Sequence, residues 1–266
     1  MALAGASVLA ALAMIVIVAP LVFALDPTAI HRQHILEAPS GRFPFGTDQL
    51  GRDVLARVVA GARVSLLVGG TAVLLGGVVG VASGLLTGYA GGVADAIVMR
   101  VWDVVLAFPG ALLGIAAATA IGPGMASVIA AGALTGLPYF SRLARASAFV
   151  EREREYVLAA RSLGARPGWI LTRHILRNAL APILVQASNL VGQAILLEAA
   201  LSYLGLGIQP PNPSLGTMLS EAQTFLGIAP WYPMLPGLML VVLVISANFL
   251  AEGANAALSR RRARRG

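Results

Sequence analysis

The sequence has no cysteine and no lysine, and only 12% of its residues are charged. Without cysteine the chain has no disulfide bond, no thiolate metal site and no iron–sulfur ligation. Without lysine it lacks the GK[ST] sequence with which the phosphate-binding loop of nucleotide hydrolases holds ATP. We therefore expect no such ATP site and no cofactor in this chain. His31 and His34 are three residues apart and could meet on a helix, but no ligand motif lies beside them, so we expect no metal site.

Apolar residues are what the sequence has in abundance. They make up 58% of its 266 residues, whereas a soluble domain normally has about a quarter of its residues charged. A chain this apolar cannot cover its surface in water, so the composition predicts an all-α integral membrane protein in a lipid bilayer. The net charge of +7 comes from arginines between apolar runs and near the C-terminus. This distribution is typical of membrane topology signals, and we expect no nucleic-acid partner.

Six stretches have the roughly 20 apolar residues that a helix needs to cross a bilayer. They are about Leu3–Leu25, Val64–Leu86, Ala96–Ile121, Met125–Ala146, Leu180–Leu204 and Met234–Leu258. The first run has no basic start and no small-residue cleavage site, so we expect a retained span rather than a signal peptide. The predicted organisation is a first span and external loop (1–60), a membrane core (61–258) and a basic tail (259–266).

The arginines predict the orientation of these spans. With six spans, fourteen arginines fall on the side of the C-terminal tail and five on the opposite side, all five in the first loop. Cytoplasmic ends of membrane spans are rich in basic residues. We therefore expect a multi-pass protein of the cytoplasmic (inner) membrane with both termini in the cytoplasm.

The first external loop contains a second helical pattern. Thr47 or Asp48 is positioned to cap a helix that continues to about Ala60. Such a helix either lies along the membrane surface or shapes the external mouth of a pathway. In the proline-rich second external loop, Glu221 and Trp231 are candidates for contacting an external partner.

Two carboxylates fall inside predicted spans. Glu198 lies in the fifth span, where an isolated carboxylate costs about 2–3 kcal/mol, so it should face the bundle interior or a water-filled cavity. Structural pairing and the lining of a pathway both remain open for it. Asp103 lies in the third span, and Arg100, one helical turn away, is its expected partner.

The stretch from Glu151 to Pro182 is the only long polar interruption in the second half of the chain. Its first part, to about Leu163, has the pattern of a helix, which Gly164 is placed to end. Pro167 suits the first turn of a second helix. The stretch therefore predicts two short helices joined by a glycine turn, too polar to cross the membrane.

This stretch resembles the EAA loop of importer-type ABC transporter permeases, whose form is E-A-A, three residues, Gly, nine residues, I-x-L-P. The positions that match are Ala159, Ala160, Gly164 and Leu176, and those that depart are Leu158, His174 and Arg177. The surrounding pattern is similar to the dipeptide/oligopeptide/nickel subfamily. Further blocks of that subfamily are FGTDQLGRDVLARVVAGARVSL, GYAGGVADAIVMRVWDVVLAFP and LLEAALSYLGLGIQPPNPSLGTMLSEA. The resemblance runs from about Phe45 to Leu258, and it is to the shorter, C-type permease of a dipeptide system.

The resemblance implies a type I ABC importer transmembrane domain with six transmembrane helices and a cytoplasmic coupling helix in a loop at about 148–178. It implies a homologous second permease, two cytoplasmic ABC ATPase subunits or domains and an extracytoplasmic substrate-binding protein as partners. The coupling residues that it implies are Glu155, Ala159, Ala160, Gly164 and Ala165, and Glu198 is a candidate pathway residue. The chain itself is expected to catalyse no reaction.

Di- and oligopeptides are the expected cargo, moved by alternating access between inward- and outward-facing states. The same architecture also suits the import of a nickel chelate or of haem. A secondary transporter driven by protons through Glu198 is the alternative of a different class, although the sequence shows no clear inverted repeats. A membrane enzyme is not supported, because the spans contain no HExxH motif, nucleophile elbow or cluster of His and Asp.

Overall fold

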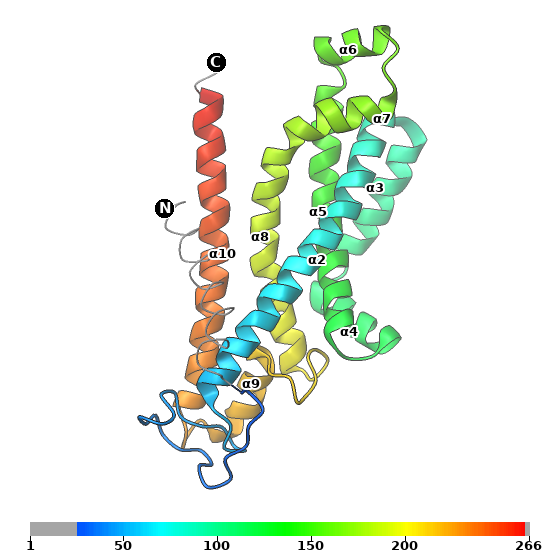
Figure 1. Cartoon of the computed structure of the whole chain (residues 1–266). Helices are drawn as coiled ribbons and strands as arrows, with labels where there is room; N and C mark the ends of the chain where they lie inside the picture. Colours follow the sequence, from blue (N-terminus) through cyan, green and yellow to red (C-terminus); the bar gives the residue numbers. More distant parts are fainter. Residues whose placement is uncertain (1–25, 264–266) are drawn as a thin grey trace.

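The computed structural model describes residues 26–263, and the regular elements of this part are helices (Figure 1). They are α2 (Val54–Ala90), α3 (Gly92–Leu106), α4 (Gly110–Ile121), α5 (Met125–Glu151), α6 (Glu155–Ser162), α7 (Pro167–Ile170), the π-helix η1 (Leu171–Ile175), α8 (Leu176–Tyr203), α9 (Leu215–Ala222), the 3₁₀ turn η2 (Gln223–Phe225) and α10 (Trp231–Ala263). The all-α fold is confirmed. The predicted first span and the last three residues of the predicted basic tail lie outside the described residues.

Three helices are long and apolar enough to cross a membrane: α2, the continuous helix Pro167–Tyr203, and Trp231–Gly253 within α10. They correspond to the second, fifth and sixth predicted spans. The fourth predicted span corresponds to α5, whose 27 residues run beside α2 (Figure 1) although its polar residues keep it out of this group. The total of six spans stays a prediction.

The third predicted span is wrong as a single helix. The chain from Ala96 to Ile121 forms α3 and α4, which meet at an angle of 92°. Pro109 explains the break, because proline has no N–H to donate and disfavours helical geometry in the residue before it, here Phe108. The break leaves a bent pair of helices packed against α5.

Close packing of α2 against α5 forms the centre of the bundle. Every fourth residue of α2 from position 76 to position 88 is glycine, and these four glycines face the backbone of α5. A Cβ at Gly76, Gly80 or Gly88 would lie 2.5–2.6 Å from a carbonyl oxygen of α5. Membrane helices pack through small residues because lipid supplies no hydrophobic drive between them. These glycines therefore allow an approach that any side chain would prevent.

At the opposite end from α6, a buried group of charges joins the first loop to the helices. This ion cluster consists of Asp48, Arg52, Arg57, Glu221 and Tyr232. The Asp48 carboxylate lies 2.6 Å from Arg52 Nε and 3.3 Å from Arg57 Nε, and the Tyr232 hydroxyl donates to Glu221 at 2.8 Å. The guanidinium Nη2 atoms of both arginines lie 3.3–3.4 Å from Glu221.

The predicted helix cap at Thr47 or Asp48 is wrong. The Asp53 side chain caps α2 by accepting from the Leu55 N–H, and α2 then continues without interruption through the predicted interfacial helix into the membrane. Asp48 instead accepts from the backbone N–H groups of Leu50 and Arg52 in a turn. Since Glu221 belongs to the ion cluster, its predicted contact with an external partner gains no support from the structure.

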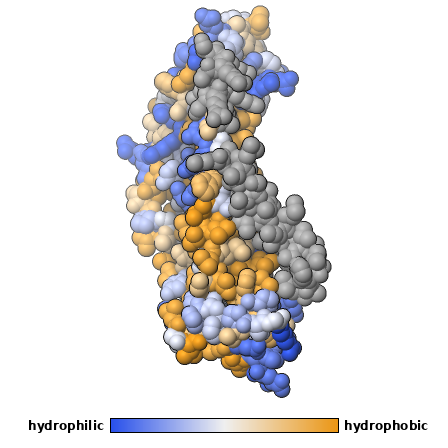
Figure 2. Space-filling model, turned by 90° about the vertical axis from the view of Figure 1, so that its left-hand side faces the viewer, coloured by the Kyte–Doolittle hydropathy of each residue, from blue (hydrophilic) through white to orange (hydrophobic). Residues whose placement is uncertain are grey.

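The two ends of the bundle differ from its middle. Figure 2 shows a large hydrophobic patch in the lower middle of one face, with strongly hydrophilic residues mostly above and below it. The helix α6 and the end of α10 lie at one end, whereas α9 and the loop before α2 lie at the other (Figure 1). This is the arrangement expected when α6 and the C-terminal end of α10 share one side of a bilayer.

Candidate functional site

The predicted coupling helix forms as α6, which extends beyond the helical bundle (Figure 1). Of its side chains, only Val157 is fully buried. Val157 packs in a cluster with Leu85 of α2, Ala148 of α5 and Ile175 of η1, and Ala160 and Ala165 cover its edge. Two of the predicted coupling residues, Ala160 and Ala165, therefore hold the helix in place rather than lying fully on its surface.

The turn after α6 depends on Gly164, as the sequence predicts. Gly164 has a φ of +79°, a left-handed conformation that glycine adopts at little cost. Its N–H donates to the Arg161 carbonyl and the Ala165 N–H donates to the Ala160 carbonyl, both at 3.0 Å. This pair of hydrogen bonds is the Schellman motif, which satisfies carbonyls that the helix end leaves free.

Apolar side chains are exposed on and beside α6. Leu163 is 88% exposed, Trp169 50% and Leu158 43%. The predicted coupling residues Glu155 and Ala159 are also exposed. Apolar groups gathered on a surface are typical of a contact site for another protein or for a membrane. Sequence reasoning missed Leu163 and Trp169, because it compared the stretch with a motif instead of asking which apolar positions the turn leaves uncovered.

A hydrogen-bonded network links α6 to α5 and α8. The Tyr156 hydroxyl donates to the Glu151 carboxylate, and the Asn178 amide donates to Tyr156 Oη at 2.9 Å and to Glu151 at 3.2 Å. Burial and the neighbouring carboxylate raise the pKa of Tyr156 to about 12, so it stays a donor at neutral pH. His174, one of the positions that departs from the motif, lies between the rings of Tyr156 and Trp169, at 5.4 and 4.8 Å.

The second helix of the stretch is not a separate short helix. Pro167 begins it as predicted, but it continues through η1 into α8 and ends only at Tyr203. Apolar residues recur on one face from Ile170 through Ile175 to Ala179, so burial against the bundle carries the helix into the membrane span. The predicted fifth span therefore begins within the polar stretch.

Glu198 is fully buried and fully paired in the described chain. Its carboxylate accepts from the hydroxyls of Ser65 at 2.7 Å, Ser202 at 2.8 Å and Ser214 at 2.9 Å. Ser65 belongs to α2 and Ser214 caps α9, so Glu198 joins three helices. These contacts are the structural pairing that the sequence left open; its lining of a pathway stays a prediction.

The predicted pairing of Asp103 with Arg100 is wrong. Asp103 lies 2.6 Å from Arg142 of α5, and the two side chains are 44% and 52% exposed. A second ion pair joins the same two helices, in which Arg145 makes two hydrogen bonds of 2.5 Å to Asp95. Packing of α3 against α5 therefore decides both pairings over the spacing along α3.

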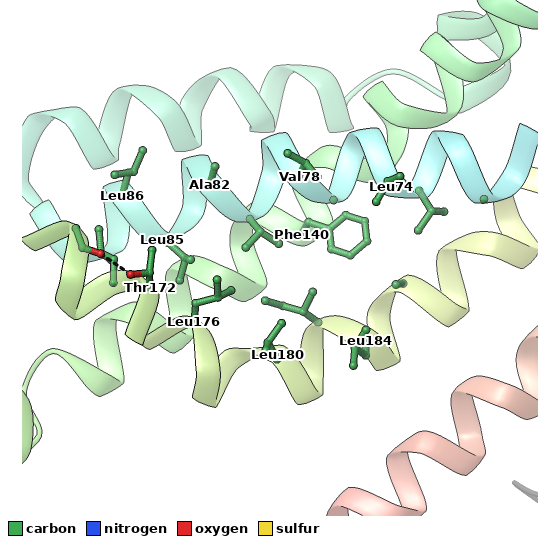
Figure 3. Close-up of a pocket in the computed structure, with 18 residues that line it drawn as sticks. Leu74, Val78, Ala82, Leu85, Leu86, Phe140, Thr172, Leu176, Leu180 and Leu184 are labelled. Carbon is green, nitrogen blue, oxygen red and sulfur yellow. Dashed lines mark hydrogen bonds between the residues drawn. The ribbon is translucent and has the colours of Figure 1, made fainter. Parts of the chain in front are cut away.

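An apolar groove of about 790 Å³ lies between α2 and α8. Figure 3 shows Leu74 and Val78 of α2, Phe140 of α5 and Leu180 of α8 among its lining. Its one hydroxyl, on Thr172, already donates to the Gly168 carbonyl at 2.8 Å. The groove therefore offers no polar group that would recognise a peptide.

Residues 80–264 match the family described as binding-protein-dependent transport system inner membrane component. The chain belongs to this family of permeases. It is 40% identical over 97% of its length to the dipeptide transport system permease protein DppC of Alkalihalophilus pseudofirmus, of which it covers 85%. It is 44% identical over 84% of its length to the glutathione transport system permease protein GsiD of Pectobacterium atrosepticum, of which it covers 74%. With the di/tripeptide transport system permease protein DppC of Pseudomonas aeruginosa it shares 40% identity over 90% of its own length and 81% of that protein.

The fold of this permease also has a solved counterpart. A chain of the MetNI methionine ABC transporter, determined in inward-facing conformations, superposes with a TM-score of 0.61. The match covers 76% of the permease and 96% of that chain at 19% sequence identity. This likeness confirms the predicted transmembrane-domain fold of an ABC importer.

Proposed function

We propose that this permease imports di- and oligopeptides across the cytoplasmic membrane as one subunit of an ATP-driven ABC importer. The observation that carries the proposal is α6 with its turn: a helix outside the bundle, held by one buried valine and edged by exposed apolar residues. The names of the permease relatives, which transport dipeptides, tripeptides and glutathione, itself a tripeptide, support a peptide cargo.

In this proposal the chain hydrolyses no ATP. Two cytoplasmic ATPase subunits or domains do so, one of them docked on α6 through Leu158, Leu163 and the coupling residues around Gly164. A homologous second permease completes the pathway, and an extracytoplasmic binding protein delivers the peptide. Both termini then lie in the cytoplasm, on the side of α6. ATP binding favours one of two arrangements of the spans, because the nucleotide has different affinities for the two states.

Uptake of a radiolabelled dipeptide into cells that express the complete transporter tests this function. We expect uptake to require the binding protein and to disappear when the ATPase partner carries an inactivating substitution. Uptake that persists with the inactive ATPase would contradict the proposal and favour a proton-coupled transporter. Uptake of a nickel chelate or of haem, but of no peptide, would change the cargo and leave the ATP-driven mechanism in place.

A further inference from the structure

One face of α5 is unusually polar for a helix in the middle of a membrane bundle. Thr135, Tyr139 and Arg142 follow one another at spacings of four and three residues, so they share one face of the helix. This face points away from the α2 glycines, which contact the α5 backbone at Ala133 and Leu137. Tyr139 is 42% exposed and the Arg142 side chain is 52% exposed.

A small pocket lies at the end of this face that is nearer the start of α5, in the elbow where α3 ends and α4 begins. It encloses about 340 Å³ and is lined by the chain from Val105 to Gly110, by Leu113, and by Thr135 and Tyr139. Near the 92° break the carbonyls of Asp103, Val104 and Val105 accept from the amides that follow α3, whereas the amides of Gly110 and Ala111 have no partner within α4. Lipid cannot satisfy such groups, so they belong next to protein or water. The volume suits a small ligand, since small-molecule sites begin at about 300 Å³.

Arg142, at the end of this polar face, forms an ion pair with Asp103 of α3. Both side chains of this ion pair are about half exposed. In the neighbouring ion pair, Arg145 donates two hydrogen bonds to Asp95, and the Asp95 side chain is only 12% exposed. Exposed charges within a membrane bundle are found facing a water-filled cavity. Because Asp103 and Arg142 share a single contact and are exposed, each can release the other and pair instead with the opposite charge of a ligand that carries both charges.

We propose that Asp103, Thr135, Tyr139 and Arg142, together with the elbow pocket, form a binding site for the charged ends of a zwitterionic peptide. Arg142 binds the peptide carboxylate and Asp103 its ammonium group, while Tyr139 and Thr135 face the residue that enters the pocket. An extended dipeptide is about 7 Å long, whereas Arg142 and Asp103 lie 2.6 Å apart. Binding both ends of the peptide therefore requires this exposed ion pair to separate. The inference rests on the proposed function and assigns the substrate contact to this face of the permease.

Cysteine labelling tests whether water reaches this face. The chain has no cysteine of its own, so a mass shift of this chain after treatment with a charged thiol reagent reports one introduced residue. In transporter reconstituted with its partner subunits, we expect Tyr139→Cys to react at least tenfold faster than Leu134→Cys. Leu134 is the matched control, because it is 37% exposed on the same helix but roughly 140° away around its axis. Thr135→Cys is a second reporter if Tyr139→Cys fails to assemble.

Protection by peptide tests the charge recognition. We expect millimolar dialanine to slow labelling of Tyr139→Cys several-fold and dialanine amide, which lacks the carboxylate, to have no effect. Adding Arg142→Gln should abolish the protection by dialanine. The exchanged pair Asp103→Arg with Arg142→Asp should not restore it, although it would rescue a pair that only holds α3 against α5.

Three results would overturn the inference. Labelling of Tyr139→Cys and Thr135→Cys no faster than that of Leu134→Cys would place the face against lipid or against the second permease. Equal protection by dialanine and its amide would show that water reaches this face but that no group on it recognises the peptide carboxylate. Restored protection in the exchanged pair would make the ion pair structural. The proposed function fails separately, when the unsubstituted transporter takes up no peptide in cells.

Discussion

The two ends of this permease are held in opposite ways. At the end that contains α9, charges are buried: Asp48 is fully buried and Arg57 is 2% exposed, inside a cluster that joins the first loop to α2, α9 and α10. At the other end, α6 buries only Val157 and leaves Leu163 88% exposed. The first end is held by charges that pair within this chain, whereas the second places exposed apolar side chains on a helix that buries one residue. Substitutions in the buried cluster of the first end should therefore affect stability, and substitutions of exposed apolar residues beside α6 should affect association.

The largest expected effect on stability comes from the ion cluster. Asp48→Asn would leave Arg57 buried beside a neutral amide, and removing one partner of a buried pair costs about 3–5 kcal/mol. We expect a marked fall in the thermal unfolding temperature of the purified permease in detergent. Glu37→Gln is the control, since Glu37 lies in the same loop with its side chain 33% exposed. Equal melting temperatures for the two variants would contradict the importance of the buried cluster.

Close helix packing should also hold the end that contains α6. A Cβ on Gly84 would overlap the backbone of α5 at Ser141, so Gly84→Ala should destabilise the permease by about 1–3 kcal/mol. Gly70→Ala makes the same change on the same helix where no atom lies within 4 Å of the new Cβ, and it should have little effect. The measurement is again thermal unfolding. Similar losses in both variants would indicate a general cost of replacing glycine instead of close approach.

The turn after α6 should affect coupling more than global stability. Gly164→Pro removes an N–H that donates to Arg161 and replaces a φ of +79° with the −65° that proline requires. We expect peptide uptake to fall at least tenfold while the unfolding temperature of the bundle changes little. Normal uptake with normal recovery of the ATPase would refute a coupling role for this turn. Gly168→Pro would be a poor control because Gly168 lies inside a helix, so Gly41→Pro in the external loop is preferable.

Substitution of Leu163 should have the smallest effect on stability. It should also show the difference between the two ends most clearly. Leu163→Ser removes an exposed side chain, so the unfolding temperature should stay within error. If Leu163 is buried in the ATPase, its loss should weaken association by about 1.5–3 kcal/mol, which is tenfold or more in affinity. Co-purification of the ATPase measures this. Leu226→Ser is the control, since Leu226 is 58% exposed at the other end, and equal ATPase recovery in both variants would exclude Leu163 from the interface.

The sequence predicted the helical elements that have a local signal. Apolar runs gave the positions of α2, α5, α8 and α10, and Gly164 with Pro167 gave the turn between α6 and α7. The break at Pro109 was within reach only in part, because Pro138, Pro182 and Pro236 lie inside predicted spans whose helices do not break. The angle of 92° between α3 and α4 could not be predicted, because packing of both helices against α5 decides how far the chain bends.

Contacts between distant residues could not be predicted. Arg100 is Asp103's neighbour in sequence, but Arg142, 39 residues away, is its partner. Asp48 has the residue type of a helix cap, and burial beside Arg52 and Arg57 gave it another role. Glu198 was recognised as unusual, yet nothing in the sequence indicates that Ser65 and Ser214 would donate to it, because three separate helices must pack before those hydroxyls meet.

Glu198 also has a mechanical consequence. It fixes α8 to α2 and α9 through the two hydroxyls of Ser65 and Ser214, five residues before the helix ends at Tyr203. From Glu198 back to Leu176 the helix extends about 33 Å at 1.5 Å per residue. A tilt of about 10° around this fixed point would leave the end at Tyr203 in place and displace the end at Leu176 by about 6 Å over that length. The hydrogen-bonded carboxylate would thus serve as the pivot of α8, with most of the movement at the end attached to α6.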